Sequence, residues 1–244
     1  MAGRSNSKLL VNSFFAGIGG FDLAFQRAGM RPAFHCEIDP YCNSVLRRHW
    51  PNLPCVPDIL DVTPDNIPDA SVWCGGFPCQ DVSVARGWLG RDGLKGKNTG
   101  LFYPFAALVK ARLPRVVVME NVTGLLNSHD GRDFAVILDT FHKLRYGVAW
   151  RVLNTRYFGA PQSRARVYIC AWKDSASQAF DVLFEPGATF HPESQRFGFL
   201  RHRPVHALAR MSRKSRTALQ LPRDDTLART GAAHMCRITT KFAD

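Results

Sequence analysis

Apolar residues along this chain follow two patterns, one typical of buried strands and one typical of amphipathic helices. Residues 9–15 (LLVNSFF) form a continuous apolar run, whereas residues 101–113 (LFYPFAALVKARL) repeat apolar positions every three or four residues. We expect Gly29 and Gly147 to cap helices and Pro114 to end one. The predicted strands cover residues 9–15, 33–39, 55–59, 70–76, 115–122, 148–159 and 165–172. The predicted helices cover residues 21–29, 41–49, 101–113 and 133–147.

The order of these elements predicts the fold class. Strands that alternate with helices at this spacing indicate an α/β fold with a doubly wound, mostly parallel sheet. The clusters AGIGG, EID, GGFPCQ and ENV each follow a predicted strand. Ligands bind beyond the carboxyl ends of such strands, so we expect one site there. After Lys173 the periodicity is lost, which predicts a domain over residues 1–172 and a short irregular basic segment over residues 173–244.

The charge of the chain indicates a polyanionic partner. The sequence holds 32 Lys and Arg against 20 Asp and Glu, a formal net charge of +12. Residues 196–223 contain eight basic residues and no acidic one. Nucleic acid is the first interpretation of such a balance, before a membrane surface. The alternative is a solvated or disordered basic tail.

The lengths of the apolar runs and the spacing of the cysteines indicate the cellular compartment. No apolar run approaches the length of a membrane span, and the N-terminus MAGRSNSKLL lacks the apolar core of a signal peptide. We therefore predict a cytoplasmic protein with reduced thiols. The seven cysteines contain no CxxC pair, so their spacing suits neither a zinc site nor a disulfide framework, and no metal is expected.

The AGIGG junction is typical of a cofactor-binding turn. Gly17, Gly19 and Gly20 allow a tight turn and a close approach of backbone to a ligand. Glu37 follows the next strand, at a spacing that suits hydrogen bonds to ribose hydroxyls. The pattern lacks the third glycine of G-x-G-x-x-G, and Asp22 is expected to repel a pyrophosphate. A nucleoside cofactor such as S-adenosylmethionine fits better, and a purely structural turn is the alternative.

The third predicted strand ends at a carboxylate. Asp58 and Ile59 stand where they could bracket an adenine, with the carboxylate accepting a hydrogen bond from the exocyclic amine. A cap of a helix or turn is the alternative role for Asp58.

The stretch GGFPCQDVS carries a cysteine in a glycine-bounded loop on the same predicted rim. Cys79 could be a buried apolar residue, a metal ligand, half of a disulfide or a nucleophile. Glu120 ends the strand of ENV, and Arg164 and Arg166 precede another strand. The segments FFAGIGGFD, EIDPYC, PDI, GGFPCQDVS, TGLF, MENV and QSRARVY, in this order, resemble the DNA (cytosine-5) methyltransferases over about residues 13–168.

The resemblance implies a Rossmann-like catalytic domain and a role for each of these groups. Cys79 would attack C6 of cytosine as a thiolate, because C5 is a poor nucleophile until the ring is activated. Glu120 would protonate or hydrogen-bond N3. Arg166 would bind O2, and Arg164 would support it and favour the thiolate. Within double-stranded DNA the ring edge is inaccessible, so the base must be flipped out.

The resemblance also implies binding residues. Those for S-adenosylmethionine are Phe15, Gly17, Ile18, Gly19, Gly20, Glu37, Ile38, Asp58, Ile59, Pro78 and Leu101. Those for DNA are Gln80, Ser83 and Gln162.

The sequence departs from the family pattern in its last third. The target-recognition region and the final family motif, whose helix packs on the cofactor domain, are not found, so residues 173–244 are interpreted as a partial recognition region. A shortened enzyme, or one completed by a second polypeptide, is the first hypothesis. An RNA cytosine-5 methyltransferase and a catalytically silent DNA-binding remnant are the alternatives.

Overall fold

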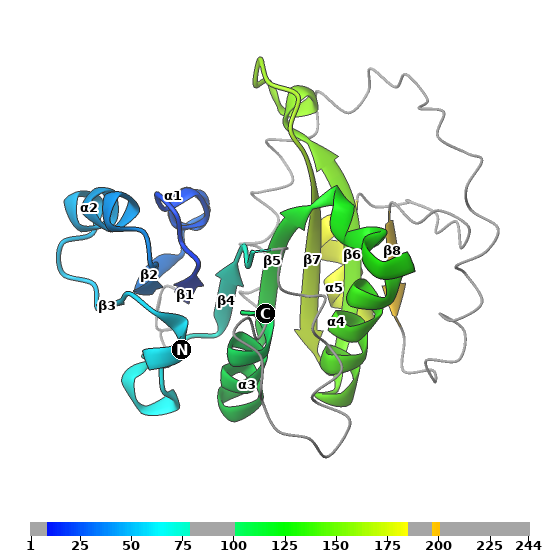
Figure 1. Ribbon diagram of the computed structural model, residues 1–244, viewed down its shortest axis with the longest axis horizontal. Helices are drawn as coiled ribbons and strands as arrows, with labels where there is room; N and C mark the ends of the chain where they lie inside the picture. The colour runs from blue at the N-terminus through cyan, green and yellow to red at the C-terminus, as the bar shows by residue number, and fades with distance from the viewer. Residues whose placement is uncertain (1–8, 79–100, 185–196, 201–244) are drawn as a thin grey trace, which may run out of the picture.

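A computed structural model describes residues 9–78, 101–184 and 197–200, the last as backbone only. It shows an α/β fold in which helices cover both faces of one sheet (Figure 1). The strands are β1 Leu10–Phe14, β2 Arg31–Cys36, β3 Cys55–Val56, β4 Val72–Gly75, β5 Val116–Val122, β6 Tyr146–Asn154, β7 Ala165–Lys173 and β8 Phe197–Leu200. The α-helices are α1 Gly20–Arg27, α2 Pro40–His49, α3 Phe102–Arg112, α4 Arg132–Lys143 and α5 Ala176–Leu183. Short 3₁₀ turns are η1 Ile59–Asp61, η2 Pro64–Asn66, η4 Thr123–Leu126, η5 Ser128–Gly131 and η6 Thr155–Phe158.

The strand order is β3-β2-β1-β4-β5-β7-β6-β8. The pairs β3–β2, β2–β1, β1–β4 and β4–β5 are parallel, whereas β7 runs antiparallel between β5 and β6. From β1 the chain winds first to β2 and β3 and then returns to β4 on the other side. The switch therefore lies between β1 and β4, where such sheets bind ligands. The predicted doubly wound, mostly parallel sheet is confirmed.

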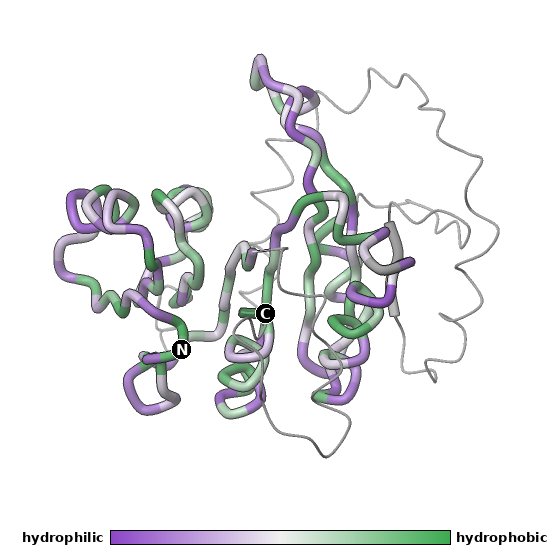
Figure 2. The backbone as a smooth tube through the Cα atoms, in the orientation of Figure 1, coloured by the Kyte–Doolittle hydropathy of each residue, from purple (hydrophilic) through white to green (hydrophobic). Residues whose placement is uncertain are grey.

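Two apolar layers hold the helices on the sheet. On one face Phe14, Phe34 and Trp73 pack with Phe105 of α3, and all four are at most 1% exposed. On the other face, buried strand residues such as Val11 pack in one cluster with residues of α1 and α5. Full burial of one such side chain contributes about 1.5–3 kcal/mol. Figure 2 shows hydrophobic residues along the strands and facing helices, and hydrophilic ones on α2 and at the β6–β7 turn.

The ends of the helices bear out one predicted glycine cap and correct another. After α1, Gly29 takes a φ of 86°, and the N–H of Met30 donates to the carbonyl of Phe25 at 2.9 Å, as in a Schellman cap. After α4, however, Arg145 takes the left-handed conformation, with a φ of 65°. Gly147 lies inside β6, where a Cβ would come within 2.1 Å of the Ala176 backbone. A glycine is needed at position 147 because the start of α5 packs closely against it, so the predicted cap at this position is wrong.

The stretch after β7 is more regular than its sequence indicates. α5 packs on β6 and β7, with Ala179 fully buried and Leu183 8% exposed. The Ser175 side chain accepts a hydrogen bond from the Gln178 N–H and begins the helix. β8 then pairs antiparallel with β6. The sheet domain thus continues past the predicted boundary at residue 172. In the described ranges no helix has the length and apolar character that crossing a bilayer requires.

Candidate functional site

The carboxyl ends of β1 to β5 and the start of β7 meet at one edge of the sheet, called the carboxyl rim below. The turn after β1 opens this rim with unusual backbone. Phe15, Gly17 and Gly19 have φ values of 51°, 56° and 86°, in the left-handed region that favours glycine. At Gly19 a Cβ would come within 2.4 Å of the Trp50 ring. Gly19 therefore allows the close approach of Trp50, at the end of α2, and its expected role toward a cofactor stays a prediction.

Glu37 joins the turns after β1 and β2. One carboxylate oxygen accepts the Gly17 N–H at 2.7 Å, and the other accepts the Asp39 N–H at 2.8 Å. The Asn43 amide donates to the Glu37 carbonyl at 2.6 Å. The side chain is thereby fixed at the rim, and each carboxylate oxygen keeps a second lone pair for a further donor.

Asp22 does not face the rim as the sequence argument assumed. Its side chain is fully buried, and one of its oxygens lies 3.1 Å from Nε2 of His35 on β2. The expected repulsion of a pyrophosphate by Asp22 is therefore wrong, because this carboxylate ties α1 to the sheet. The absence of the third glycine still distinguishes the turn from a dinucleotide fingerprint.

Exposed apolar side chains follow each of the first three strands at this rim. Ile18, Ile38 and Leu60 are 60%, 67% and 63% exposed. Asp58 accepts the Leu60 N–H at 2.9 Å and so caps η1. Ile59, in contrast, is 4% exposed and belongs to the core. Asp58 is therefore the one residue of the expected adenine-binding pair whose side chain is accessible.

These residues fit a nucleoside-type cofactor. Apolar side chains suit the faces of a purine, whereas the carboxylates of Glu37 and Asp58 suit hydroxyl and amine donors. Phe15 is half-buried and holds its ring edge-to-face on Phe105, with centroids 6.4 Å apart. Its left-handed φ is uncommon for a bulky residue, and strained backbone of this kind clusters at ligand sites.

Glu120 and two arginines form the opposite half of the rim. Oε1 of Glu120 lies 3.0 Å from Nε of Arg166 and 3.8 Å from a terminal nitrogen of Arg164. The β5–β7 register explains this meeting. Arg166 lies opposite Val122, and side chains two residues apart share a face of a sheet, so Glu120 and Arg166 are diagonal neighbours. The alternation in QSRAR brings both arginines to the face that carries Glu120.

The same register places Tyr168 opposite Glu120. Burial raises the pKa of the Tyr168 phenol, and the neighbouring Glu120 raises it further, while both arginines act in the other direction. Its ring also meets Phe21 of α1 edge-to-face at 6.5 Å. Tyr168 thus stays neutral at physiological pH, and its contacts link the Glu120–Arg166 pair to α1.

Asn121 fixes the loop that leads to Cys79. Its amide donates to the Phe77 carbonyl at 2.8 Å, and its oxygen accepts the Val122 N–H. Phe77 is buried against Phe102 of α3. The sequence argument did not single out Asn121, although its place beside Glu120 in ENV was a signal. The chain therefore leaves the core at a fixed point two residues before Cys79.

Several predicted residues lie at or beyond the limits of the described chain. Pro78 is exposed and is the last residue before the gap, and Leu101, partly buried against the core, is the first after it. Cys79, Gln80 and Ser83 lie outside the described residues. Gln162 is exposed in the β6–β7 turn, where its carbonyl accepts the Thr155 hydroxyl at 2.7 Å.

The cysteines within the described ranges are poor candidates for a nucleophile. Burial raises the pKa values of Cys36 and Cys170 to about 12, and that of Cys74 well above its usual range. Loss of hydration is also the main cause of the raised pKa values of Cys42 and Cys55. Because the thiolate is the reactive form, the raised pKa values disfavour the reactive state of these five cysteines at neutral pH.

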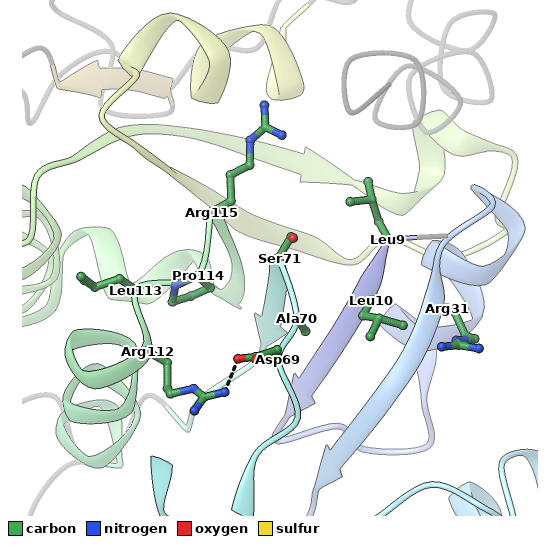
Figure 3. A pocket seen from close by; sticks show the side chains of 10 residues that line it. All are labelled: Leu9, Leu10, Arg31, Asp69, Ala70, Ser71, Arg112, Leu113, Pro114 and Arg115. Atoms are coloured by element: carbon green, nitrogen blue, oxygen red, sulfur yellow. Dashed lines mark hydrogen bonds and ion pairs between the residues drawn. The ribbon is translucent and has the colours of Figure 1, made fainter. Parts of the chain in front are cut away.

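A cavity of about 780 Å³ lies at the other end of the sheet (Figure 3). Its lining includes Leu10, Ser71 and Arg115, which stand at or just before the first residues of β1, β4 and β5. Asp69 there pairs with Arg112, with the aspartate side chain 98% exposed. The candidate residues that the structure describes, such as Glu37, Glu120 and Arg166, lie at the carboxyl rim, so we place the site there and not in this cavity.

Comparison with known proteins identifies relatives of this chain. The model of the C-5 cytosine-specific DNA methylase family matches residues 9–217. The type II methyltransferase M.HaeII of Haemophilus aegyptius is 40% identical over 160 residues, which are 66% of this chain and 49% of M.HaeII. M.NgoBI of Neisseria gonorrhoeae is 37% identical over 161 residues, 66% of this chain and 50% of the relative. The chain thus spans about half the length of these curated relatives.

Solved structures agree on the fold. The S. pombe Dnmt2 methyltransferase superposes with a TM-score of 0.57 at 21% identity, covering 69% of this chain and 52% of its own. A putative DNA modification methyltransferase encoded within an E. coli prophage gives a TM-score of 0.58 at 22% identity, covering 70% and 48%. At such identities the likeness concerns the fold alone.

Proposed function

Since the chain belongs to the C-5 cytosine-specific DNA methylase family, we propose that it contributes the catalytic half of an enzyme that methylates C5 of cytosine in double-stranded DNA. One observation carries the proposal beyond the family match. Glu120 is held at 3.0 Å by Arg166, on the same rim as the fixed entry to the PCQ loop. A carboxyl group, a guanidinium and a loop cysteine are the groups that this reaction requires.

The cofactor in this proposal is S-adenosylmethionine, which supplies an electrophilic methyl group when bound. Glu37 would accept its ribose hydroxyls, and Asp58 its adenine amine. Ile18 and Ile38 would cover the apolar parts of the nucleoside, and Phe15 would face the sulfonium, since an aromatic ring attracts a cation. The exposure of both isoleucines and the fixed carboxylate of Glu37 support this assignment.

The chain's own residues activate the cytosine. The thiolate of Cys79 forms a bond to C6, and Glu120 gives a proton to N3, so the electron pair of the C5–C6 double bond becomes available at C5. C5 would then bond to the methyl group as the bond between that methyl group and the cofactor's sulfur breaks, and C5 would lose its proton to a base. The electron pair left at C5 would re-form the double bond and expel the Cys79 thiolate, and the N3 proton would return to Glu120.

The arginine pair sets the position of the base. Arg166 holds one oxygen of Glu120, while the other lies beside Gly76, where a Cβ would come within 3.1 Å of it. In the proposal that second oxygen meets N3, and the remaining donors of Arg166 meet O2 of the flipped-out cytosine. Arg164, 49% exposed, adds positive charge that favours the thiolate.

We further propose that methylation needs residues equivalent to the half of the relatives that this sequence does not span. Ile18 and Leu23, 60% and 45% exposed, flank the cofactor turn on the side of α1 and offer it an apolar contact. Without that contact, binding of S-adenosylmethionine should be weak. On the face of the sheet that α1 covers, the apolar strand residues of the described chain are buried, apart from the partly buried Tyr168, so the proposed contact is limited to the turn and α1.

The test is methyl transfer from tritiated S-adenosylmethionine to duplex DNA, by the chain alone and with the missing half added from a relative. We expect transfer in the complemented reaction, and its loss in Cys79→Ser with cofactor binding unchanged by calorimetry. DNA containing 5-fluorocytosine, which cannot lose a proton from C5, should trap a covalent adduct. An adduct that persists in Cys79→Ser, or transfer to RNA in preference to DNA, would contradict the proposal.

A further inference from the structure

The turn that joins β6 to β7 stands apart from the rest of the carboxyl rim. Residues 154–164 extend beyond the sheet as a hairpin that projects past the neighbouring loops (Figure 1). We call residues 155–164 the hairpin tip. It lies directly before Arg166, whose guanidinium contacts Glu120. Any macromolecule that presents a base to Glu120 therefore comes close to this tip.

The composition of the hairpin is basic and aromatic. From residue 146 to residue 173 the chain has five Lys and Arg and no Asp or Glu. Within the tip, Arg156, Phe158 and residues 161–164 are all exposed. Phe158 is 45% exposed, a large fraction for an aromatic side chain. An apolar ring presented between cationic side chains is typical of a nucleic-acid surface.

The tip is held by its own hydrogen bonds. The Asn154 side chain accepts the N–H groups of Arg156 and Arg164, at 3.2 and 3.1 Å. The Arg164 carbonyl accepts the Thr155 N–H at 3.2 Å. The guanidinium of Arg156 donates to the Ser163 hydroxyl at 2.6 Å, which leaves its other N–H groups for a ligand. These bonds fix the tip before binding, so little conformational entropy is lost when a partner is bound.

From these observations we propose that the hairpin tip is a DNA-contacting surface that enters a groove beside the target cytosine. Arg156 would bind a phosphate, and Phe158 would pack on the adjoining nucleoside. Residues 155–158 form the 3₁₀ turn η6 and not a paired strand, so the proposed contact is made by a compact turn at the end of the β6–β7 ladder. The proposal rests on the proposed function for the position of the DNA, and it adds a contact that is separate from residues 196–223.

A cross-linking experiment tests the placement directly. A photoreactive phenylalanine analogue at position 158 should cross-link to duplex DNA in the full chain. The control position is Leu113, which is 46% exposed beside the cavity at the other end of the sheet and should give no cross-link. Equal cross-linking at both positions, or preferential cross-linking of position 158 to duplex RNA, would overturn the proposal.

Charge variants test the phosphate contact. Arg156→Gln should lower duplex affinity several-fold and reduce the slope of log affinity against log salt by about 1, with Arg156→Lys closer to wild type. Arg31→Gln removes the same charge from an exposed position at the start of β2 and should leave the slope unchanged. An unchanged slope in Arg156→Gln would refute the contact. Cross-linking without methyl transfer would support the DNA contact of the hairpin tip and contradict the proposed function. Methyl transfer without cross-linking would support the proposed function and contradict the DNA contact of the tip.

Discussion

The two halves of the carboxyl rim are held by different kinds of hydrogen bond. In the half formed by β1, β2 and β3, the Glu37 carboxylate accepts main-chain N–H groups at 2.7 and 2.8 Å. In the half formed by β4, β5 and β7, the Glu120 carboxylate is held by the Arg166 side chain. The first arrangement fixes backbone, whereas the second can exchange partners without moving a strand. We infer that the first half acts as a rigid binding site and that the second can reorganise during a reaction.

The largest expected effect comes from Glu120→Gln, which breaks the reactive half alone. The amide keeps the size of the side chain and can donate a hydrogen bond, but it is too weak an acid to transfer a proton to N3, so kcat should fall about 10²- to 10⁴-fold. The measurement is methyl transfer in the complemented reaction, with cofactor affinity followed by calorimetry. A weakened cofactor affinity with normal kcat would contradict the division of the rim.

Glu37→Gln should break the binding half and has a smaller expected effect. Loss of charge-assisted hydrogen bonds to the ribose and to Gly17 should weaken binding of S-adenosylmethionine about 10- to 100-fold. Asp61→Asn, at an exposed position in η1, is the matched control and should bind as wild type. Calorimetry compares the two variants. Equal binding by both would mean that Glu37 serves the turn and not the cofactor.

Two glycine variants sharpen the distinction between strain and packing, and their expected effect is on stability and not on activity. Gly17→Ala meets no atom within 4 Å and should cost only the left-handed conformation, about 1 kcal/mol of unfolding free energy. Gly19→Ala also meets the Trp50 ring and should cost about 1–3 kcal/mol more. Urea unfolding of both variants gives the comparison. The packing role assigned to Gly19 would be wrong if the two losses were equal.

Most of the sheet could be predicted because its strands are continuous apolar runs bounded by glycine or polar residues. β5, which carries Glu120, is an example, and its predicted end at Val122 is confirmed. Helix ends were harder to predict, since Arg145 adopts the left-handed turn that the sequence assigned to Gly147. Helix α5 was missed because the sequence after Lys173 shows no sustained periodicity, although Ser175, which caps the helix, was a signal that could have found it.

The candidate site was predictable as a set of residue types but not as a set of partners. The sequence placed Glu37 and Glu120 at strand ends, and the structure agrees. It could not show that Asp22 turns inward to His35, because that depends on how α1 packs on β2. Nor could it show that Asn121 secures Phe77, a contact between residues 44 positions apart.

The antiparallel direction of β7 has a consequence for how this protein can change over evolution. If β7 ran parallel to β6, the chain would need a long crossover connection back to the opposite end of the sheet. Because β7 is antiparallel to β6, a short turn at the carboxyl rim joins the two strands. Residues can be inserted at such a turn without altering any strand that the core depends on. The turn between β6 and β7 is therefore the part of the rim where insertions and substitutions should change the stability of the fold least. Glu120 and Arg166 would keep their register in such variants.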